Sequence, residues 1–323
     1  MPTPFHHPVP RDATVYVAGH GGLVGSAIWR HLTEQGFTNL VGRRSAELDL
    51  RDPVATRDFF AQYRPAYVID AAARVGGILA NNSTPADFIS ENLRIQTNLI
   101  DAAHEFGVAR LLFLGSSCIY PKLAAQPIRE DSLLTGPLEP TNQAYAIAKI
   151  AGIAHVQAMR RQHGRSFISA MPTNLYGPGD NFDPTTSHVL PATIRRLHTA
   201  VAQGARSVTV WGTGTPRREF LYVDDLAAAC LALLERYDDD APINVGTGED
   251  MTIRDLVTLV AAVVGYTGEV SFDTSKPDGT PRKVLDVSRI HALGWRAATS
   301  LRAGIEQTVQ WYETSLTMAG VAR

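Results

Sequence analysis

The fold of this chain can be predicted from the segment Thr14-Val-Tyr-Val-Ala-Gly19-His-Gly-Gly22-Leu-Val-Gly25. Residues 14–18 have the pattern of a short buried strand, and apolar residues at Ala27, Ile28 and Leu32 continue the segment as a helix. Glycines spaced G-x-x-G-x-x-G between a strand and a helix permit a tight turn, close approach of a pyrophosphate and close packing of the helix on the strand. Glycine turns also occur without a ligand, so the flanking strand and helix carry the prediction of a dinucleotide site.

Strands and helices alternate through the first half of the chain. The pattern predicts strands at 40–41, 66–70, 111–114 and 166–171, and helices at 53–63, at about 87–106 and around Tyr145 and Lys149. Such alternation is typical of a parallel sheet covered by helices on both faces. We therefore predict an α/β fold with a doubly wound parallel sheet of the Rossmann type.

The alternation breaks after Pro172, where loops rich in Gly, Pro and Asn begin. A helix near 190–203 and short strands at 207–211 and 243–246 predict a smaller α/β substrate domain. The helix at 224–236 is expected to pack back on the first domain. The predicted division is a disordered tail at 1–12, a dinucleotide-binding domain at 13–171 plus about 212–243, and a substrate-binding domain at 172–211 plus about 244–315.

Composition excludes several classes of protein. The chain has 323 residues, 45% of them hydrophobic, and 30 basic against 32 acidic residues, with no basic run of the kind that binds nucleic acid. No stretch approaches the ~20 apolar residues of a membrane span, and the first residues lack the apolar core of a signal peptide, so we expect a cytoplasmic protein. Cys118 and Cys230 form no disulfide framework, and the adjacent His6 and His7 predict no metal site.

Two arginines follow the second predicted strand, where an NAD site usually has an acidic residue that holds the ribose 2'-hydroxyl. Arg43 and Arg44 suit a 2'-phosphate instead, which favours NADPH/NADP+ as the cofactor. The alternative is that both guanidiniums are simply solvated in a surface loop.

A hydroxyl, a phenol, an amine and a thiol lie in two short segments. Ser116 and Cys118 follow the predicted strand 111–114, at the sheet edge where open α/β sheets place their ligands. Tyr145 and Lys149 are four residues apart, so on a helix they share one face, where the ammonium can lower the pKa of the phenol. These groups suit hydride transfer with proton donation, although a Tyr/Lys pair at this spacing also occurs on exposed helices.

These residues and several longer motifs resemble the extended short-chain dehydrogenase/reductases, and among them the GDP-L-fucose synthases, over almost the whole chain. The motifs are Ala71-Ala-Ala-Arg-Val-Gly-Gly-Ile-Leu-Ala-Asn-Asn82, Leu112-Phe-Leu-Gly-Ser-Ser-Cys-Ile-Tyr-Pro-Lys122, Glu139-Pro-Thr-Asn142, Tyr145-Ala-Ile-Ala-Lys-Ile-Ala-Gly152, Met171-Pro-Thr-Asn-Leu-Tyr-Gly-Pro178, Trp211-Gly-Thr-Gly-Thr-Pro216 and Lys276-Pro-Asp-Gly-Thr-Pro-Arg-Lys283. The resemblance implies a bifunctional enzyme that epimerises C3 and C5 of GDP-4-keto-6-deoxy-D-mannose and then reduces C4 with NADPH.

The resemblance also implies roles for single residues. Ser116, Tyr145 and Lys149 would form the reductase triad, with Lys149 also holding the nicotinamide ribose. Cys118 would be the base of the epimerisation and His188 the acid, because a 4-keto group acidifies the protons on C3 and C5. Without the resemblance, a lone cysteine at a strand end is more often a buried hydrophobe, and a loop histidine is more often a solvated bystander.

Binding residues follow from the same resemblance. The cofactor contacts would be Gly19, Gly22, Leu23, Val24, Gly25, Arg43, Arg44, Asp49, Lys149, Pro172, Asn174, Leu175 and His188. The substrate contacts would be Arg196, Trp211, Arg218 and Asp278, with Arg195 and Arg217 as adjacent alternatives and a turn role as the alternative for Asp278. Helices near 87–106 and 143–162 resemble those through which the family forms a homodimer.

Two positions depart from the family. Its glycine turn usually reads Gly-His-Arg-Gly, whereas this chain has Gly21 in place of the arginine, and Ser45 stands where another arginine is common. We therefore expect a weaker preference for NADPH over NADH. Two other functions stay open on sequence: a different nucleotide-sugar epimerase, reductase or dehydratase, which Cys118 with His188 argues against, and a non-catalytic NADP(H) sensor, which would not need the triad.

Overall fold

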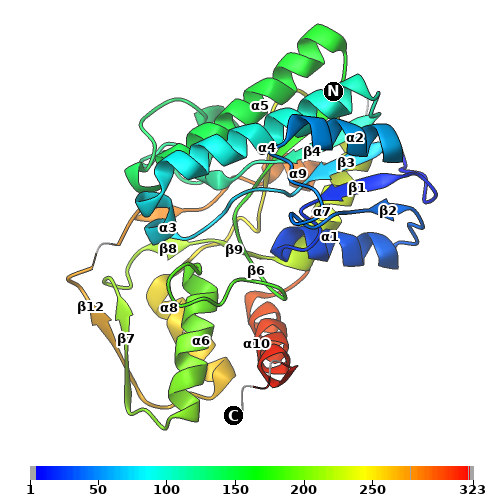
Figure 1. The fold of residues 1–323 in the computed structure, drawn as a ribbon. Coiled ribbons are helices and arrows are strands. Elements are labelled where there is room, and N and C mark those ends of the chain that lie inside the picture. Colours follow the sequence, from blue (N-terminus) through cyan, green and yellow to red (C-terminus); the bar gives the residue numbers. More distant parts are fainter. Residues whose placement is uncertain (1–4, 277, 319, 321–323) are drawn as a thin grey trace.

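Six short strands pair in parallel and form the central sheet of the molecule (Figure 1). The computed structural model describes residues 5–276, 278–318 and 320. Along the sheet the strands are β10 (Ile243–Val245), β5 (Ser166–Pro172), β4 (Arg110–Leu114), β3 (Tyr67–Asp70), β1 (Val15–Ala18) and β2 (Leu40–Val41). Every residue of β1, β3 and β4 is buried, which explains why these strands are nearly continuous apolar runs. The predicted parallel α/β sheet is confirmed.

Helices cover both faces of this sheet (Figure 1). On the upper face in the figure lie α2 (Pro53–Tyr63), α4 (Pro85–Glu105) and α5 (Gln143–His163), and below it lie α1 (Leu23–Glu34) and α7 (Val223–Arg236). Leu226 and Cys230 of α7 belong to the same buried cluster as the strands, so this helix packs on the first domain as predicted. The shorter helices are α3 (Ile78–Ser83) and α9 (Ser288–Ala292), with single 3-10 turns at Ser117–Ile119, Glu130–Ser132 and Pro140–Asn142.

A second, smaller hydrophobic cluster lies below the sheet in Figure 1. It is built on α6 (Val189–Ala202), α8 (Ile253–Val264) and α10 (Leu301–Met318), with the parallel pair β7 (Ser207–Trp211) and β12 (Glu269–Asp273). Val208 and Val210 of β7 are buried and their neighbours are exposed, because successive side chains of a strand point to opposite faces. The remaining strands between the two clusters are β6 (Asn174–Tyr176), β8 (Arg217–Arg218), β9 (Phe220–Tyr222), β11 (Met251–Thr252) and β13 (Arg282–Lys283).

The predicted boundary at about 243 is wrong for two segments. The strand at 243–246 was assigned to the smaller domain, yet β10 pairs with β5 at the edge of the central sheet. Leu285, Ile290 and Trp295, also predicted to lie in the smaller domain, belong to the first cluster. A three-residue strand carries too little periodicity to reveal its sheet, so pairing with a distant segment decides its place.

The predicted disordered tail is also wrong for the residues that the structure describes, and residues 1–4 lie outside them. The His7 N–H donates to the carbonyl of Glu235 at 2.8 Å, and Val9 is only 2% exposed. A proline-rich segment can be ordered when one of its apolar side chains is buried and a backbone group forms a hydrogen bond.

Within the described part of the chain, no helix has the length and apolar character needed to cross a membrane.

Candidate active site

The glycine turn lies at the carboxyl edge of the sheet, where β1 sits between β2 and β3 and the strand order reverses. Gly19 has φ of +77°, and a Cβ there would lie 2.8 Å from the carbonyl oxygen of Ala71. A Cβ at Gly25 would lie 2.1 Å from the carbonyl oxygen of Gly19. Both positions therefore require glycine, whereas Gly22 is less crowded, with its nearest contact at 3.5 Å.

Helix α1 begins directly after this turn without a capping side chain. Gly22 is its N-cap, no acidic residue lies in its first turn, and no other described residue accepts from the N–H groups of Leu23, Val24 or Gly25. These free donors, together with the helix dipole, favour an anion. A dinucleotide pyrophosphate therefore fits the cradle that the glycines leave open.

The predicted triad comes together at the ends of β4 and α5. Ser116 is half-buried, and its Oγ accepts from the N–H of Cys118 at 3.2 Å. Lys149 is 3% exposed, and its Nζ donates to the carbonyl of Leu114 at 2.8 Å. Tyr145 lies one turn before Lys149 and is half-buried, with its ring edge-on to Phe88 of α4. The sequence separation of four thus places both side chains toward the strand end that carries Ser116.

The pKa of Tyr145 differs from the expectation drawn from its spacing to Lys149. Burial raises the pKa of the phenol, the Cys118 thiolate raises it further, and a hydrogen bond with Ser116 opposes the rise. The expected lowering by Lys149 is therefore wrong for this state of the site. The physical reason is that burial disfavours the phenolate, while Lys149 itself turns to the Leu114 carbonyl and to Asp70.

Asp70 is a site residue that the sequence analysis missed. It ends β3, is fully buried, and accepts from the Ala72 N–H at 3.1 Å through one oxygen, while the other oxygen has no partner among the described residues. Burial raises the pKa of Asp70 to about 6, and Lys149 lowers it. A carboxyl group in an otherwise apolar strand was the signal that could have drawn attention to it.

Cys118 lies in the 3-10 turn that follows β4, beside a lysine from a distant strand. The Nζ of Lys283 is 3.5 Å from the Cys118 Sγ. Burial raises the pKa of the thiol, but Lys283, hydrogen bonds with Ser116 and Lys283, and the Arg218 guanidinium together bring this pKa below its usual value. Cys230 shows the contrast, because burial alone raises its pKa to about 12. Lys283 was quoted in the Lys276–Lys283 motif but was not assigned a role.

His188 caps α6 on the far side of the same region. Its loop is tied to the segment after β3, because the N–H of Gly77 donates to the carbonyl of Thr186 at 3.0 Å. The imidazole reaches solvent but has protein on several sides, so desolvation lowers its pKa and Lys283 lowers it further. Lys283 thus lowers the pKa of His188 as well as that of Cys118.

Comparison with known proteins agrees with this arrangement. Residues 15–246 match the model of the NAD dependent epimerase/dehydratase family. The chain is 61% identical to GDP-L-fucose synthase 1 of Arabidopsis thaliana, covering 94% of each chain, and 57% identical to GDP-L-fucose synthase of Escherichia coli, covering 92% of this chain and 96% of that protein. The chain belongs to the NAD dependent epimerase/dehydratase family, among its GDP-L-fucose synthases.

A solved structure of the same group has the same fold. The GDP-L-fucose synthetase from Naegleria fowleri bound to NADP superposes with a TM-score of 0.90 at 31% identity, covering 97% of this chain and 96% of that chain. The resemblance drawn from the sequence motifs is therefore confirmed.

The two arginines after β2 differ in their surroundings. The Arg43 guanidinium donates to the carbonyl of Gly42 at 2.7 Å and to the Tyr63 hydroxyl, and it stacks 4.8 Å from the Tyr63 ring centre. Arg44 is exposed, and no other described residue pairs with its guanidinium. His20 of the glycine turn lies against Gly42, where an added Cβ would be 2.5 Å from the imidazole. Of the two arginines after β2, Arg44 is therefore the one whose guanidinium has no partner among the described residues.

Gly21 has room for the cation that the family usually has there. A Cβ at this position meets nothing within 4 Å, and its φ lies outside the left-handed region. We expect Gly21→Arg to raise the ratio of kcat/KM for NADPH to that for NADH about tenfold, since a charge-assisted contact to a phosphate contributes roughly 1.5 kcal/mol. Gly21→Gln, which fills the space without charge, is the matched control. Equal ratios in both variants would contradict the expectation.

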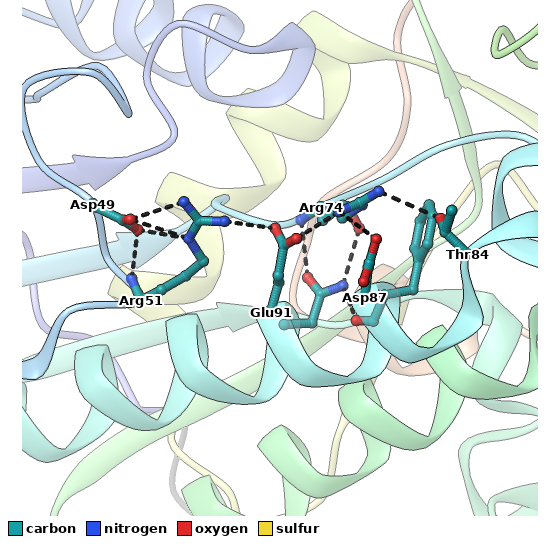
Figure 2. A network of polar contacts seen from close by, with 8 residues as sticks. Asp49, Arg51, Arg74, Thr84, Asp87 and Glu91 are labelled. Carbon is teal, nitrogen blue, oxygen red and sulfur yellow. Dashed lines mark hydrogen bonds and ion pairs between the residues drawn. The ribbon is translucent and has the colours of Figure 1, made fainter.

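Asp49, one of the predicted cofactor residues, forms an ion pair with Arg51. Figure 2 shows a chain of ion pairs in which Arg51 joins Asp49 to Glu91 and Arg74 joins Glu91 to Asp87. Arg74 also donates a hydrogen bond to the Thr84 hydroxyl. The network ties α4 to the segment after β3, which contacts both the glycine turn and the His188 loop. Residues of this network line a hollow of about 460 Å³ together with Asp52, Ser90 and Arg94. None of the reacting groups lines it, so it is not the reaction site.

Pro172, Asn174 and Leu175 follow β5 at the carboxyl edge. Pro172 ends β5, and the Asn174 side chain donates to the carbonyl of Glu219 at 2.8 Å. Asn174 and Leu175 are half-buried. Their place beside the triad strand is compatible with contact to the nicotinamide end of a bound cofactor.

Ion pairing distinguishes Arg217 from Arg218. Arg217 binds Asp250 at 2.9 Å, and Arg282 binds the same carboxylate, so Arg217 is engaged in structure. Arg218 is half-buried near Cys118 and Asp278, and burial lowers its pKa. Among the described residues no carboxylate forms an ion pair with Arg218, and its guanidinium lowers the pKa of the Cys118 thiol.

The other predicted substrate residues, Arg196, Trp211 and Asp278, lie in or contact the segment 209–213. Arg196 is exposed and donates to the carbonyl of Thr209 at 2.6 Å, and Trp211 is 63% exposed. Both oxygens of Asp278 accept from Thr213, at 2.7 and 2.8 Å. Asp278 thus orders the loop after Trp211, which is a different role from the turn within its own segment that was the alternative. Its remaining lone pairs are what it can offer a ligand.

Asp180, in the loop after β6, is a buried acid with a stability cost. One oxygen accepts from the Asn181 N–H at 2.7 Å, the other has no partner among the described residues, and burial raises the pKa to about 7. Because the folded pKa lies above the ordinary value, this group favours the folded state below pH ~4 and loses that contribution as the pH rises to ~7. We expect Asp180→Asn to raise the free energy of unfolding by about 2–4 kcal/mol at pH 8 and very little at pH 4.

Urea unfolding at both pH values measures this difference. Asp183→Asn is the matched control in the same loop, because hydrogen bonds with Thr185 and Thr186 lower the pKa of Asp183 and its replacement should destabilise the protein at pH 8. A stabilisation by Asp180→Asn of equal size at both pH values would contradict the assignment.

Proposed function

We propose that this GDP-L-fucose synthase converts GDP-4-keto-6-deoxy-D-mannose to GDP-L-fucose, with NADPH as the reductant. The observation that carries the proposal is that Cys118, held beside Lys283 at 3.5 Å, shares one site with Ser116, Tyr145 and Lys149. An enzyme that only reduces its substrate would not need the Cys118 thiol. A non-catalytic sensor would need neither this thiol nor the triad of Ser116, Tyr145 and Lys149. The names of the relatives support the same substrate and product.

Epimerisation at C3 and C5 requires a base and an acid on opposite faces of the sugar. We assign the base to the Cys118 thiolate, which takes the proton from the carbon while its electron pair moves to the C4 oxygen. His188 then gives a proton to the other face of the same carbon. The lowered pKa of the thiol favours the thiolate near neutral pH, and the lowered pKa of His188 makes its imidazolium form a stronger acid.

Reduction at C4 requires a proton donor beside the carbonyl oxygen. When bound, NADPH supplies the hydride. Tyr145, whose raised pKa keeps the phenol protonated, gives its proton to the C4 oxygen, and the Ser116 hydroxyl orients that oxygen. Lys149 stays fixed by its hydrogen bond to the Leu114 carbonyl, and its remaining donors can hold the nicotinamide ribose.

Two assays on the wild-type protein test this function. With NADPH and the keto sugar nucleotide, we expect loss of the reduced nicotinamide absorbance and formation of GDP-L-fucose. In D₂O without NADPH, we expect deuterium at C3 and C5 of the recovered substrate. NADPH oxidation without exchange would indicate a simple reductase, and neither reaction would indicate a sensor.

We also propose a cytoplasmic homodimer. Both cysteines are free thiols, which suits a reducing compartment, and the Cys118 thiolate needs to stay unoxidised. Helices α4 and α5 lie side by side on one face of the sheet, and Ile147 of α5 is 41% exposed there. A monomer mass in sedimentation at micromolar concentration would remove the dimer from the proposal.

A further inference from the structure

Lys283 reaches the active site from a strand whose direction is fixed by ion pairs. In β13, Lys283 is the parallel register partner of Arg218, and Arg282 is the partner of Arg217 in β8. Arg217 and Arg282 both bind Asp250, so these two side chains share one face of the small sheet. Because successive side chains of a strand alternate, Lys283 and Arg218 point to the other face. That face is the one where Cys118 lies.

The backbone around Lys283 holds it at this position. The Arg217 N–H donates to the carbonyl of Pro281 at 2.8 Å, the Glu219 N–H donates to the carbonyl of Lys283 at 3.3 Å, and the Ile128 N–H donates to the carbonyl of Val284 at 2.8 Å. The ammonium itself has one hydrogen-bond partner among the described residues, the Cys118 Sγ. The lysine is therefore anchored along its backbone and directed at the thiol.

The groups that face Cys118 come from several elements. Ser116 lies in the same turn, Tyr145 comes from α5, Arg218 from β8 and Lys283 from β13. Lys283 is the cation in direct contact, and Arg218 acts from farther away. In a half-buried site, removal of the contacting cation removes most of the charge that stabilises a thiolate.

We propose that Lys283 is the positioning residue that holds Cys118 as a thiolate and thereby makes it the base of the epimerisation, an inference that rests on the proposed function. The proton balance is simple. The C–H bond of the sugar breaks, an S–H bond forms on Cys118, and the N–H proton of His188 passes to the opposite face of the carbon. Lys283 keeps its own protons throughout, so it supplies charge and position only.

The first test needs no substrate. The rate of alkylation of Cys118 by iodoacetamide, followed against pH, reports its thiolate, and buried Cys230 does not interfere. We expect Lys283→Met to move the midpoint upward and to slow alkylation about tenfold at neutral pH, because loss of one contacting charge shifts a pKa by roughly one unit or more. Lys283→Arg should restore most of the rate. Arg282→Met, on the same strand but directed at Asp250, should leave the midpoint unchanged.

The second test separates this inference from the proposed function. In Lys283→Met the pKa of Cys118 and the pKa of His188 should both rise, so the pH optimum of deuterium exchange should move upward, while NADPH binding persists. If Lys283→Met does not fold, Lys283→Gln gives the same comparison. A midpoint equal to that of the wild type in the alkylation test overturns the role of Lys283. If the midpoint shifts in Lys283→Met but the wild-type protein shows no deuterium exchange, the proposed function is overturned instead.

Discussion

Tyr145→Phe is expected to lower kcat for NADPH oxidation about 1,000-fold, because a positioned general acid typically contributes 10²–10⁴ in rate. The variant keeps the ring that packs edge-on to Phe88 and loses only the hydroxyl. Since Cys118 and His188 are untouched, deuterium exchange at C3 and C5 should continue near the wild-type rate. The two half-reactions would then be separated in one variant. The measurements are the absorbance of the reduced nicotinamide and the deuterium content of recovered substrate.

Tyr266→Phe is the matched control for this prediction. Tyr266 is buried in the second cluster, and its hydroxyl donates to the carbonyl of Glu269 at 3.4 Å, far from the reacting groups in the fold. Loss of that hydroxyl should leave both half-reactions intact. If Tyr145→Phe kept more than about a tenth of the wild-type kcat, another proton donor would have to be sought.

Cys118→Ser should give the opposite separation. A serine hydroxyl is far less acidic than the thiol, and the charge of Lys283 at 3.5 Å cannot bring it near neutral pH. We expect exchange at C3 and C5 to fall at least about 1,000-fold, as for loss of a general base. Any product of NADPH oxidation should then retain the configuration of the substrate at both carbons.

Cys230→Ala provides the comparison for Cys118→Ser. Cys230 is fully buried in α7 and lies in the first cluster, so its replacement affects packing and leaves the site alone. Exchange should stay at the wild-type rate in this variant. If deuterium exchange persisted in Cys118→Ser, Cys118 would not be the base, and His188 would be the next residue to test for that role.

Most of the fold was predictable because local sequence controls it. Gly19 and Gly25 need to be glycine for steric reasons within one turn, and the buried runs at β3 and β4 predict central strands wherever the chain places them. The errors fall on segments without local signals. The three residues of β10 join the central sheet through pairing with β5, and the segment at 5–12 is ordered through contacts with Glu235.

Within the site, the pairs that are close along the chain could be predicted from their spacing. Tyr145 and Lys149 share a helix face because of the helical repeat, and Ser116 and Cys118 share a strand end because they are two residues apart. The charges that act on them come from distant segments, and the packing of the folded chain brings these together. Lys283 meets Cys118 across 165 residues, Asp70 reaches Lys149 from another strand, and Asp250 occupies Arg217 so that Arg218 is left for the site. Local spacing is fixed by covalent geometry, whereas the strength of an ionic contact depends on burial and distance, and these are set by how remote strands pair.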